Sequence, residues 1–167
     1  MMNETIKIIS CGGTFEKKYD PISGNLVFNK SCINELIKKS RSTKTFSFEN
    51  IMMIDSLDMK DEHRIQIASN VNESKEEKII IIHGTDTMVK TGKTIAIKKR
   101  PVQKVVITGA MVPESMDNSD AFFNFGYALC AIDFASPGVW IAMNGYLFEC
   151  NNVIKNTKKG IFQNKKK

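Results

Sequence analysis

Threonine hydroxyls follow glycine at two places in the chain, each time just after a short apolar run. The first turn is Gly12-Gly13-Thr14, and the second is Gly84-Thr85-Asp86, which comes after Ile79–Ile82 and His83. A threonine hydroxyl becomes a useful nucleophile when a neighbouring group takes its proton and N–H donors hold the oxyanion that forms. Glycine lets backbone N–H groups approach a ligand closely. Two such turns predict acyl-transfer chemistry at a site that they share.

Asp86 and a lysine would supply the remaining chemistry. Asp86 follows Thr85 directly, where its carboxylate could bind the ammonium group of a substrate or orient a lysine. A lysine acts as a base when burial or neighbouring charge lowers its pKa. The chain has many lysines, and the residue pattern alone does not choose among them.

Five strand-like segments alternate with four helix-like segments. The expected strands are 5–10, 46–54, 78–82, 102–108 and 139–143, and the expected helices are 31–39, 61–74, 86–99 and 119–135. Such alternation predicts an α/β fold with an open, mostly parallel sheet and helices on both faces, a flavodoxin-like three-layer sandwich. Right-handed crossovers place the strand-to-helix loops at one edge of the sheet, where ligands bind. The two Gly-Thr turns should therefore meet.

Two segments depart from this alternation. Segment 15–28 has turn residues at Asp20-Pro21 and Ser23-Gly24-Asn25, which predict a hairpin flap over the end of the first strand. From Asn151 onward the apolar pattern fades, and this fading predicts an irregular end. We therefore expect one folded domain over residues 1–155 and a basic tail over residues 156–167.

Apolar periodicity also predicts which helix faces are buried. On the helix expected at 61–74 the buried stripe is Ile65, Ala68 and Val71, and on the helix expected at 119–135 it is Phe122, Phe125, Leu129 and Ile132. Ser31 is the expected N-cap of the first helix.

Composition is that of an ordinary globular domain. The 167 residues are 42% hydrophobic and 25% charged, which is enough for one core. No apolar run approaches the roughly 20 residues that span a bilayer, and residues 1–5 lack the features of a secretory signal. The four cysteines (Cys11, Cys32, Cys130 and Cys150) form no C-x-x-C pair, and Cys11 and Cys130 lie in apolar stretches that predict burial. This pattern favours the reducing cytoplasm.

Other kinds of site fit less well. The net charge of +6 comes largely from lysine clusters without interleaved aromatic residues, so solvated helix ends are favoured over a nucleic-acid surface. Thr91-Gly92-Lys93-Thr94 resembles the end of a P-loop, but position 87 is threonine where that motif needs glycine. The two histidines have no partners at metal-ligand spacing. We expect no metal, no organic cofactor and no membrane contact.

Several motifs together resemble the bacterial-type L-asparaginase/glutaminase family, in its short, single-domain form. They occur in the family's order from about residue 6 to 160 and are Cys11-Gly12-Gly13-Thr14-Phe15, Tyr19-Asp20-Pro21-Ile22-Ser23-Gly24, Asp55-Ser56-Leu57-Asp58-Met59, His83-Gly84-Thr85-Asp86-Thr87-Met88, Thr108-Gly109-Ala110-Met111, Ser119-Asp120-Ala121-Phe122-Phe123-Asn124 and Val153-Ile154-Lys155-Asn156-Thr157.

The resemblance implies a role for each matching residue. Thr14 is the implied nucleophile, and Tyr19 on the flap helps to activate it. The second implied triad is Thr85, Asp86 and Lys155. The implied substrate contacts come from Ser56 and Asp86, from position 57 and from the backbone of Ala110. The implied chemistry is hydrolysis of a side-chain amide in two steps through a threonine acyl-enzyme, with no cofactor and with a homodimer or larger homo-oligomer as the assembly.

Three departures separate the chain from most of that family. It lacks the length for the usual second domain, Leu57 replaces a polar residue, and the flap between Thr14 and Tyr19 is short. The leading hypothesis is a cytoplasmic L-asparaginase that acts more weakly on L-glutamine. The alternatives are an ammonia-donating amidase subunit of an amidotransferase and a non-catalytic amino-acid-binding module.

Overall fold

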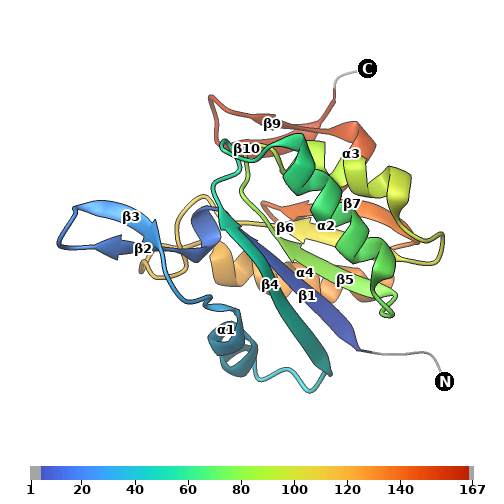
Figure 1. The fold of residues 1–167 in the computed structure, drawn as a ribbon, viewed down its shortest axis with the longest axis horizontal. Coiled ribbons are helices and arrows are strands. Elements are labelled where there is room, and N and C mark those ends of the chain that lie inside the picture. Colours follow the sequence, from blue (N-terminus) through green and yellow to red (C-terminus); the bar gives the residue numbers. More distant parts are fainter. Residues whose placement is uncertain (1–4, 166–167) are drawn as a thin grey trace.

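One open sheet organises the fold in the computed structural model, which describes residues 5–165. Within these residues the sheet has six strands in the order β4-β1-β5-β6-β7-β8 (Figure 1). The strands are β1 (Ile6–Gly12), β4 (Phe46–Ile54), β5 (Lys78–Ile82), β6 (Lys104–Thr108), β7 (Gly138–Met143) and β8 (Tyr146–Glu149). The first five are parallel, whereas β8 runs antiparallel to β7. The expected parallel α/β sheet is therefore confirmed, with an antiparallel edge strand added.

Helices cover both faces of the sheet and give two cores. The helices are α1 (Ile33–Ser40), α2 (Asp61–Glu73), α3 (Met88–Lys98) and α4 (Ala121–Phe134). Alternate residues of a strand point to opposite faces. Ile79 and Ile81 of β5 accordingly pack with α2 and α3, while Ile80 and Ile82 pack with α1 and α4. This arrangement is the predicted three-layer sandwich.

The flap after β1 is the predicted hairpin. A 3-10 turn, η1 (Thr14–Glu16), leads into β2 (Lys17–Asp20), which pairs antiparallel with β3 (Asn25–Phe28). The hairpin projects away from the sheet (Figure 1). At its tip the Asp20 carboxylate accepts the N–H groups of Ile22 and Ser23, each at 3.1 Å.

The irregular end expected after Asn151 is wrong. The short turn η2 (Cys150–Asn152) leads into β9 (Val153–Asn156), which pairs antiparallel with β10 (Ile161–Asn164). The hairpin crosses the boundary expected at residue 155. Each of its strands has only four residues and one buried apolar residue, Val153 in β9 and Phe162 in β10. With a polar turn between them, these strands show no alternating apolar pattern in the sequence. The expectations for residues 1–4 and 166–167 lie outside the described residues.

Several predicted faces and ends also need correction. Ile65 is 47% exposed, because Arg64, Ile67, Ala68 and Val71 form the buried side of α2. Phe122 is exposed on α4, and so is Cys130. Helix α1 begins at Ile33, with Cys32 as its N-cap, so Ser31 is not the cap. Within residues 5–165, no helix combines the length and the apolar character that crossing a membrane requires.

Candidate active site

The two Gly-Thr turns touch back to back. A Cβ built on Gly13 would lie 2.4 Å from Cα of Gly84, closer than real Cβ atoms come to backbone. Gly13 also has φ +73°, in the region that glycine adopts most easily. The neighbouring strands are in register, with Ser10 of β1 beside Ile82 of β5. The turns that carry Thr14 and Thr85 therefore leave the sheet at one point, as the sequence predicted.

Lys155 reaches the second turn from the hairpin β9–β10. Its Nζ donates to Oγ1 of Thr85 at 2.8 Å and forms an ion pair with Oδ1 of Asp86 at 2.6 Å. The Lys155 side chain is 10% exposed and Thr85 is buried. The three residues that the family resemblance singled out as a triad are therefore in direct contact.

The hairpin that carries Lys155 is fixed to the sheet by two features. Phe162, the cross-strand partner of Lys155, is buried. Its backbone N–H donates to Oδ1 of Asn144 at 2.9 Å. Asn144 has φ 56° in the turn between β7 and β8, a conformation that asparagine tolerates better than most residues. Lys155 is thus held by a fixed strand pair rather than by a free tail.

Thr14 begins η1, where it is half-buried and its hydroxyl forms no hydrogen bond within residues 5–165. Two residues later, Glu16 is 1% exposed. Its carboxylate accepts hydrogen bonds from Oγ of Ser10 at 2.5 Å, Oγ of Ser31 at 2.7 Å and N of Cys32 at 2.8 Å. Glu16 therefore ties the turn of Thr14 to β1 and to the start of α1, a role that sequence reasoning missed.

Ser56 is buried against Gly84, and its hydroxyl has no partner among the described residues. A Cβ on Gly84 would lie 2.5 Å from Cβ of Ser56, and Oγ of Ser56 is a buried atom without a hydrogen bond. The carbonyl of Ser56 accepts the hydroxyl of Thr87 at 2.8 Å. Leu57 is 72% exposed, and its N–H donates to Oδ1 of Asp55 at 3.0 Å. The loop thus offers one buried hydroxyl beside the second turn.

Ala110 lies buried in the loop that follows β6. The next two backbone N–H groups, of Met111 and Val112, each donate to the Asp120 carboxylate at 3.0 Å. Nδ2 of Asn124 donates to the carbonyl of Gly109, also at 3.0 Å. The first turn of α4 and the residue before it therefore hold this loop on both sides of Ala110.

Tyr19 lies apart from the other predicted residues. It is 59% exposed on β2 and hydrogen-bonds through its side chain to no described residue. The base of the flap is nevertheless anchored, because Nζ of Lys17 forms an ion pair with Oδ2 of Asp55 at 2.5 Å. Hydrogen bonding to Lys17 lowers the pKa of Asp55. The structure therefore ties the flap to the loop of Ser56 without placing the Tyr19 ring on Thr14.

The His83 side chain holds the backbone of the second turn, as the sequence suggested. It is buried, and burial lowers its pKa to about 4, so the imidazole is neutral at pH 7. Nδ1 then donates to the carbonyl of Gly84 at 2.8 Å, and Nε2 accepts the hydroxyl of Thr91 at 2.8 Å. The ring fixes the backbone that precedes Thr85.

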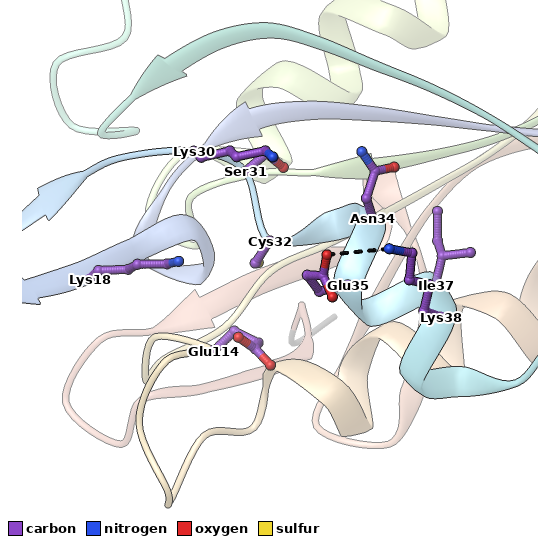
Figure 2. A pocket seen from close by; sticks show the side chains of 9 residues that line it. All are labelled: Lys18, Lys30, Ser31, Cys32, Asn34, Glu35, Ile37, Lys38 and Glu114. Carbon is purple, nitrogen blue, oxygen red and sulfur yellow. Dashed lines mark ion pairs between the residues drawn. The ribbon is translucent and has the colours of Figure 1, made fainter.

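A separate hollow of about 510 Å³ lies between the flap and α1 (Figure 2). Its lining includes Lys18, Lys30, Cys32 and Glu114. None of the residues with predicted catalytic or substrate-binding roles lines it. The hollow is therefore distinct from the site around Thr14, Thr85 and Lys155.

Comparison with known proteins identifies the family. The family model described as "Asparaginase, N-terminal" matches residues 5–163. The chain belongs to the asparaginase family. L-asparaginase 2 of Escherichia coli is 29% identical over 159 residues, which are 90% of this chain and 46% of that protein. A subunit of the glutamyl-tRNA(Gln) amidotransferase of Saccharolobus islandicus is 30% identical over 139 residues, or 80% of this chain and 31% of that protein.

Solved structures of asparaginases share the fold. The thermostable L-asparaginase from Thermococcus kodakarensis superimposes with a TM-score of 0.84 at 26% identity, over 96% of this chain and 51% of that one. A probable cytoplasmic L-asparaginase from Campylobacter jejuni gives the same TM-score and identity, over 97% and 53%. This asparaginase-family chain therefore spans about half the length of these relatives, or less.

Proposed function

We propose that the chain hydrolyses the side-chain amide of L-asparagine to L-aspartate and ammonia, and that it acts more slowly on L-glutamine. The observation that carries the proposal is the contact of the Lys155 ammonium with Thr85 and Asp86, beside the point where Gly13 meets Gly84. This contact joins a lysine, a hydroxyl and a carboxylate next to the turn that carries the Thr14 hydroxyl. The relatives named L-asparaginase support the same reaction.

In the first proposed step, Oγ of Thr14 attacks the carbon of the substrate amide. The phenol oxygen of Tyr19 accepts the hydroxyl proton while Tyr19 gives its own proton to the leaving nitrogen, so that the C–N bond breaks and ammonia departs. An ester between Thr14 and the substrate acyl group remains. Since Tyr19 is largely exposed, this step requires the flap to close over Thr14.

In the second proposed step, water attacks the ester carbon and releases L-aspartate and free Thr14. Thr85 orients the water, accepts its proton and passes its own hydroxyl proton on to the Thr14 oxygen, while the Lys155 ammonium donates a hydrogen bond to the Thr85 oxygen. Asp86 stabilises the lysine in its charged form across the 2.6 Å ion pair. The proton ends on the Thr14 oxygen as the ester bond breaks, so the site returns to its starting state.

Substrate binding in this proposal uses the buried hydroxyl of Ser56, which has no partner among the described residues and donates to the α-carboxylate. The Asp86 oxygen that does not contact Lys155 accepts the α-ammonium, and the backbone of Ala110 receives the amide. The side chain of Leu57 offers no polar group to the substrate. A missing charge-assisted contact costs about 1.5–3 kcal/mol, which is roughly a ten- to hundred-fold weaker substrate affinity. We therefore expect a high KM.

The second candidate function is ammonia donation within an amidotransferase. The similarity to a glutamyl-tRNA(Gln) amidotransferase chain favours it, because 80% of this chain aligns with that protein. Such a chain would release ammonia efficiently only with a partner protein and a charged tRNA.

The test is ammonia release by the purified chain from L-asparagine and L-glutamine. We expect Thr14→Ala to lower kcat by at least about a thousand-fold, as loss of a nucleophile does. Thr43→Ala is the matched control, since Thr43 is exposed and far along the chain from both turns. Full activity of Thr14→Ala would refute the assigned nucleophile. Turnover only with tRNA or a partner would favour the second function, and binding without ammonia release would leave an amino-acid-binding module.

Lys155→Met should lower kcat by about a hundred- to thousand-fold, the usual contribution of one positioned hydrogen-bond donor in an active site. Lys158→Met, in the exposed turn of the same hairpin, should retain activity. Equal losses in both variants would show that the hairpin matters only for folding and would remove Lys155 from the mechanism.

A further inference from the structure

Lysines already balance the carboxylates of the proposed active site. Asp86 forms an ion pair with Lys155 at 2.6 Å. Asp55, in the loop between β4 and α2, forms an ion pair with Lys17 at 2.5 Å. Asp58, in the same loop, is exposed to solvent, where water weakens its attraction for a cation. Among these three carboxylates, a substrate α-ammonium therefore finds none that is both unpaired and shielded from water.

The Asp86 carboxylate is a poor partner for a second ammonium. Its Oδ1 holds Nζ of Lys155, so an ammonium bound to the other oxygen of the same carboxylate would lie close to that Nζ. Two positive charges at such short range repel each other. The Lys155 side chain is only 10% exposed, so water and salt screen this repulsion little. A substrate whose α-nitrogen carries no charge avoids the repulsion.

The same site suits an anionic group. Oγ of Ser56 is buried and has no hydrogen-bond partner among the described residues, which is uncommon for a buried polar atom. A hydroxyl can donate to a carboxylate. Ser56 packs against Gly84, the residue before Thr85. The site therefore accommodates the α-carboxylate of the proposed substrate better than its α-ammonium.

An exposed apolar side chain follows Ser56 in the loop. Leu57 is 72% exposed, and its Cα lies about 3.8 Å from that of Ser56. The Leu57 N–H donates to Oδ1 of Asp55 at 3.0 Å, and Asp55 is itself paired with Lys17, so these contacts hold Leu57 in place. The α-nitrogen of an amino acid is two bonds from its carboxylate carbon. A group attached to that nitrogen can therefore pack on Leu57 when Ser56 binds the carboxylate.

We propose that the chain also hydrolyses N-acyl-L-asparagines, in which a small acyl group makes the α-nitrogen a neutral amide, at least as efficiently as free L-asparagine. This inference rests on the proposed function, because it concerns the substrate range of the same site. Acylation removes the charge that Lys155 repels, keeps the α-carboxylate for Ser56 and places an apolar group on Leu57. Each methyl group buried in this way changes binding roughly fourfold.

The bonds that form and break are those of the proposed reaction. Oγ of Thr14 attacks the carbon of the side-chain amide, ammonia leaves, and water then cleaves the ester. The products are an N-acyl-L-aspartate and ammonia. The bond between the acyl group and the α-nitrogen stays intact, because that amide lies at the Ser56 end of the substrate rather than at Thr14.

The experiment is ammonia release by the full chain from three amides that share one carbon skeleton: L-asparagine, succinamate, which lacks the α-nitrogen, and N-acetyl-L-asparagine. Loss of the charge should raise kcat/KM for succinamate about three- to tenfold above that for L-asparagine, and the acetyl group should add roughly fourfold. A chain that prefers L-asparagine over both other amides would overturn the inference and leave the proposed function standing. Ammonia release from none of the three would refute the proposed function as well.

Leu57→Asn tests the packing of the acyl group, since asparagine is close to leucine in size but polar. We expect the ratio of kcat/KM on N-acetyl-L-asparagine to that on succinamate to fall roughly fourfold, with unchanged far-ultraviolet circular dichroism. Ile97→Asn is the matched control, because Ile97 is an apolar residue that is 85% exposed at the end of α3 away from Thr85. This variant should keep the ratio. An unaltered ratio in Leu57→Asn would overturn the role of Leu57.

Calorimetric binding to Thr14→Ala gives a second measurement, which needs neither turnover nor a change at Leu57. N-acetyl-L-asparagine should bind this variant at least about threefold more tightly than L-asparagine does. Tighter binding of L-asparagine would overturn the inference, because it would show that the site favours a charged α-nitrogen.

Discussion

Removing the Glu16 carboxylate should destabilise the protein strongly, although Glu16 has no part in the proposed reaction. The carboxylate accepts three hydrogen bonds at 2.5, 2.7 and 2.8 Å. Glu16→Ala leaves the Ser10 hydroxyl, which is 0% exposed, and the buried N–H of Cys32 without acceptors. Each orphaned buried donor costs about 1–3 kcal/mol. We expect a loss of about 2–6 kcal/mol in the free energy of unfolding, a large part of the usual 5–15 kcal/mol.

Glu16→Gln should cost much less, about 1 kcal/mol. Its amide oxygen can accept the Cys32 N–H, while the hydroxyls of Ser10 and Ser31 rotate and accept the two amide hydrogens. The assay is urea unfolding, read from the midpoint at constant slope. Glu35→Ala is the control, since the side chain of Glu35 is 78% exposed, and it should change stability by less than about 0.5 kcal/mol. An alanine variant within about 1 kcal/mol of the unmodified protein, or a glutamine variant as unstable as alanine, would refute this reasoning.

Two further predictions concern groups near the site. Burial lowers the pKa of His83 to about 4, below about 6.5 in the unfolded chain, so the unfolded chain binds more protons between these pH values. The contribution of His83 to the free energy of unfolding should therefore be fully present above about pH 6.5 and fall by roughly 3 kcal/mol as the pH drops to about 4. Urea unfolding across this pH range should show the fall, and His83→Gln should flatten it. Lys17→Met removes the ion pair that ties the flap to Asp55; we expect KM to rise about three- to tenfold, because a part-buried pair contributes about 1 kcal/mol, with kcat nearly unchanged, and an unaltered KM would contradict the anchoring role.

The residue pattern predicted the sheet and the meeting of the two turns because both depend on local signals. Continuous isoleucine in β5 and the Gly-Thr turns at two strand ends specify where these strands stop and which kind of turn comes next. The crossover rule then places both turns at one edge. The contact of Gly13 with Gly84 is the physical result.

The spacing of residues in the sequence does not predict the contacts of Lys155 or the burial of Glu16. Lys155 reaches Thr85 only because β9 pairs with β10, and four-residue strands around a polar turn give too little alternation to be recognised. Glu16 is one charged residue beside others, and its burial follows from a helix start that lies sixteen residues away. The family resemblance supplied a role for Lys155, whereas nothing in the pattern marked Glu16.

Helix α4 shows a second reason why the sequence pattern mispredicts which residues are buried. Periodicity assigns the apolar side of a helix to the interior, but α4 is apolar on both sides. The pattern therefore predicts Phe122 inside and Cys130 buried, whereas both are exposed. Phe125, Leu129 and Ile132 pack into the core, while Phe122 and Cys130 lie on the opposite side of the helix.

The place of Lys155 has a consequence for synthesis on the ribosome. Thr14 emerges early, but the strand that holds Lys155 in place is closed by Ile161–Asn164. A nascent chain adds about 5–20 residues per second, so Thr14, Thr85 and Asp86 are all made seconds before the lysine can be fixed beside them. An elongating chain therefore carries the proposed nucleophile before Lys155 is in place, and the proposed reaction can begin only once the hairpin β9–β10 has left the exit tunnel.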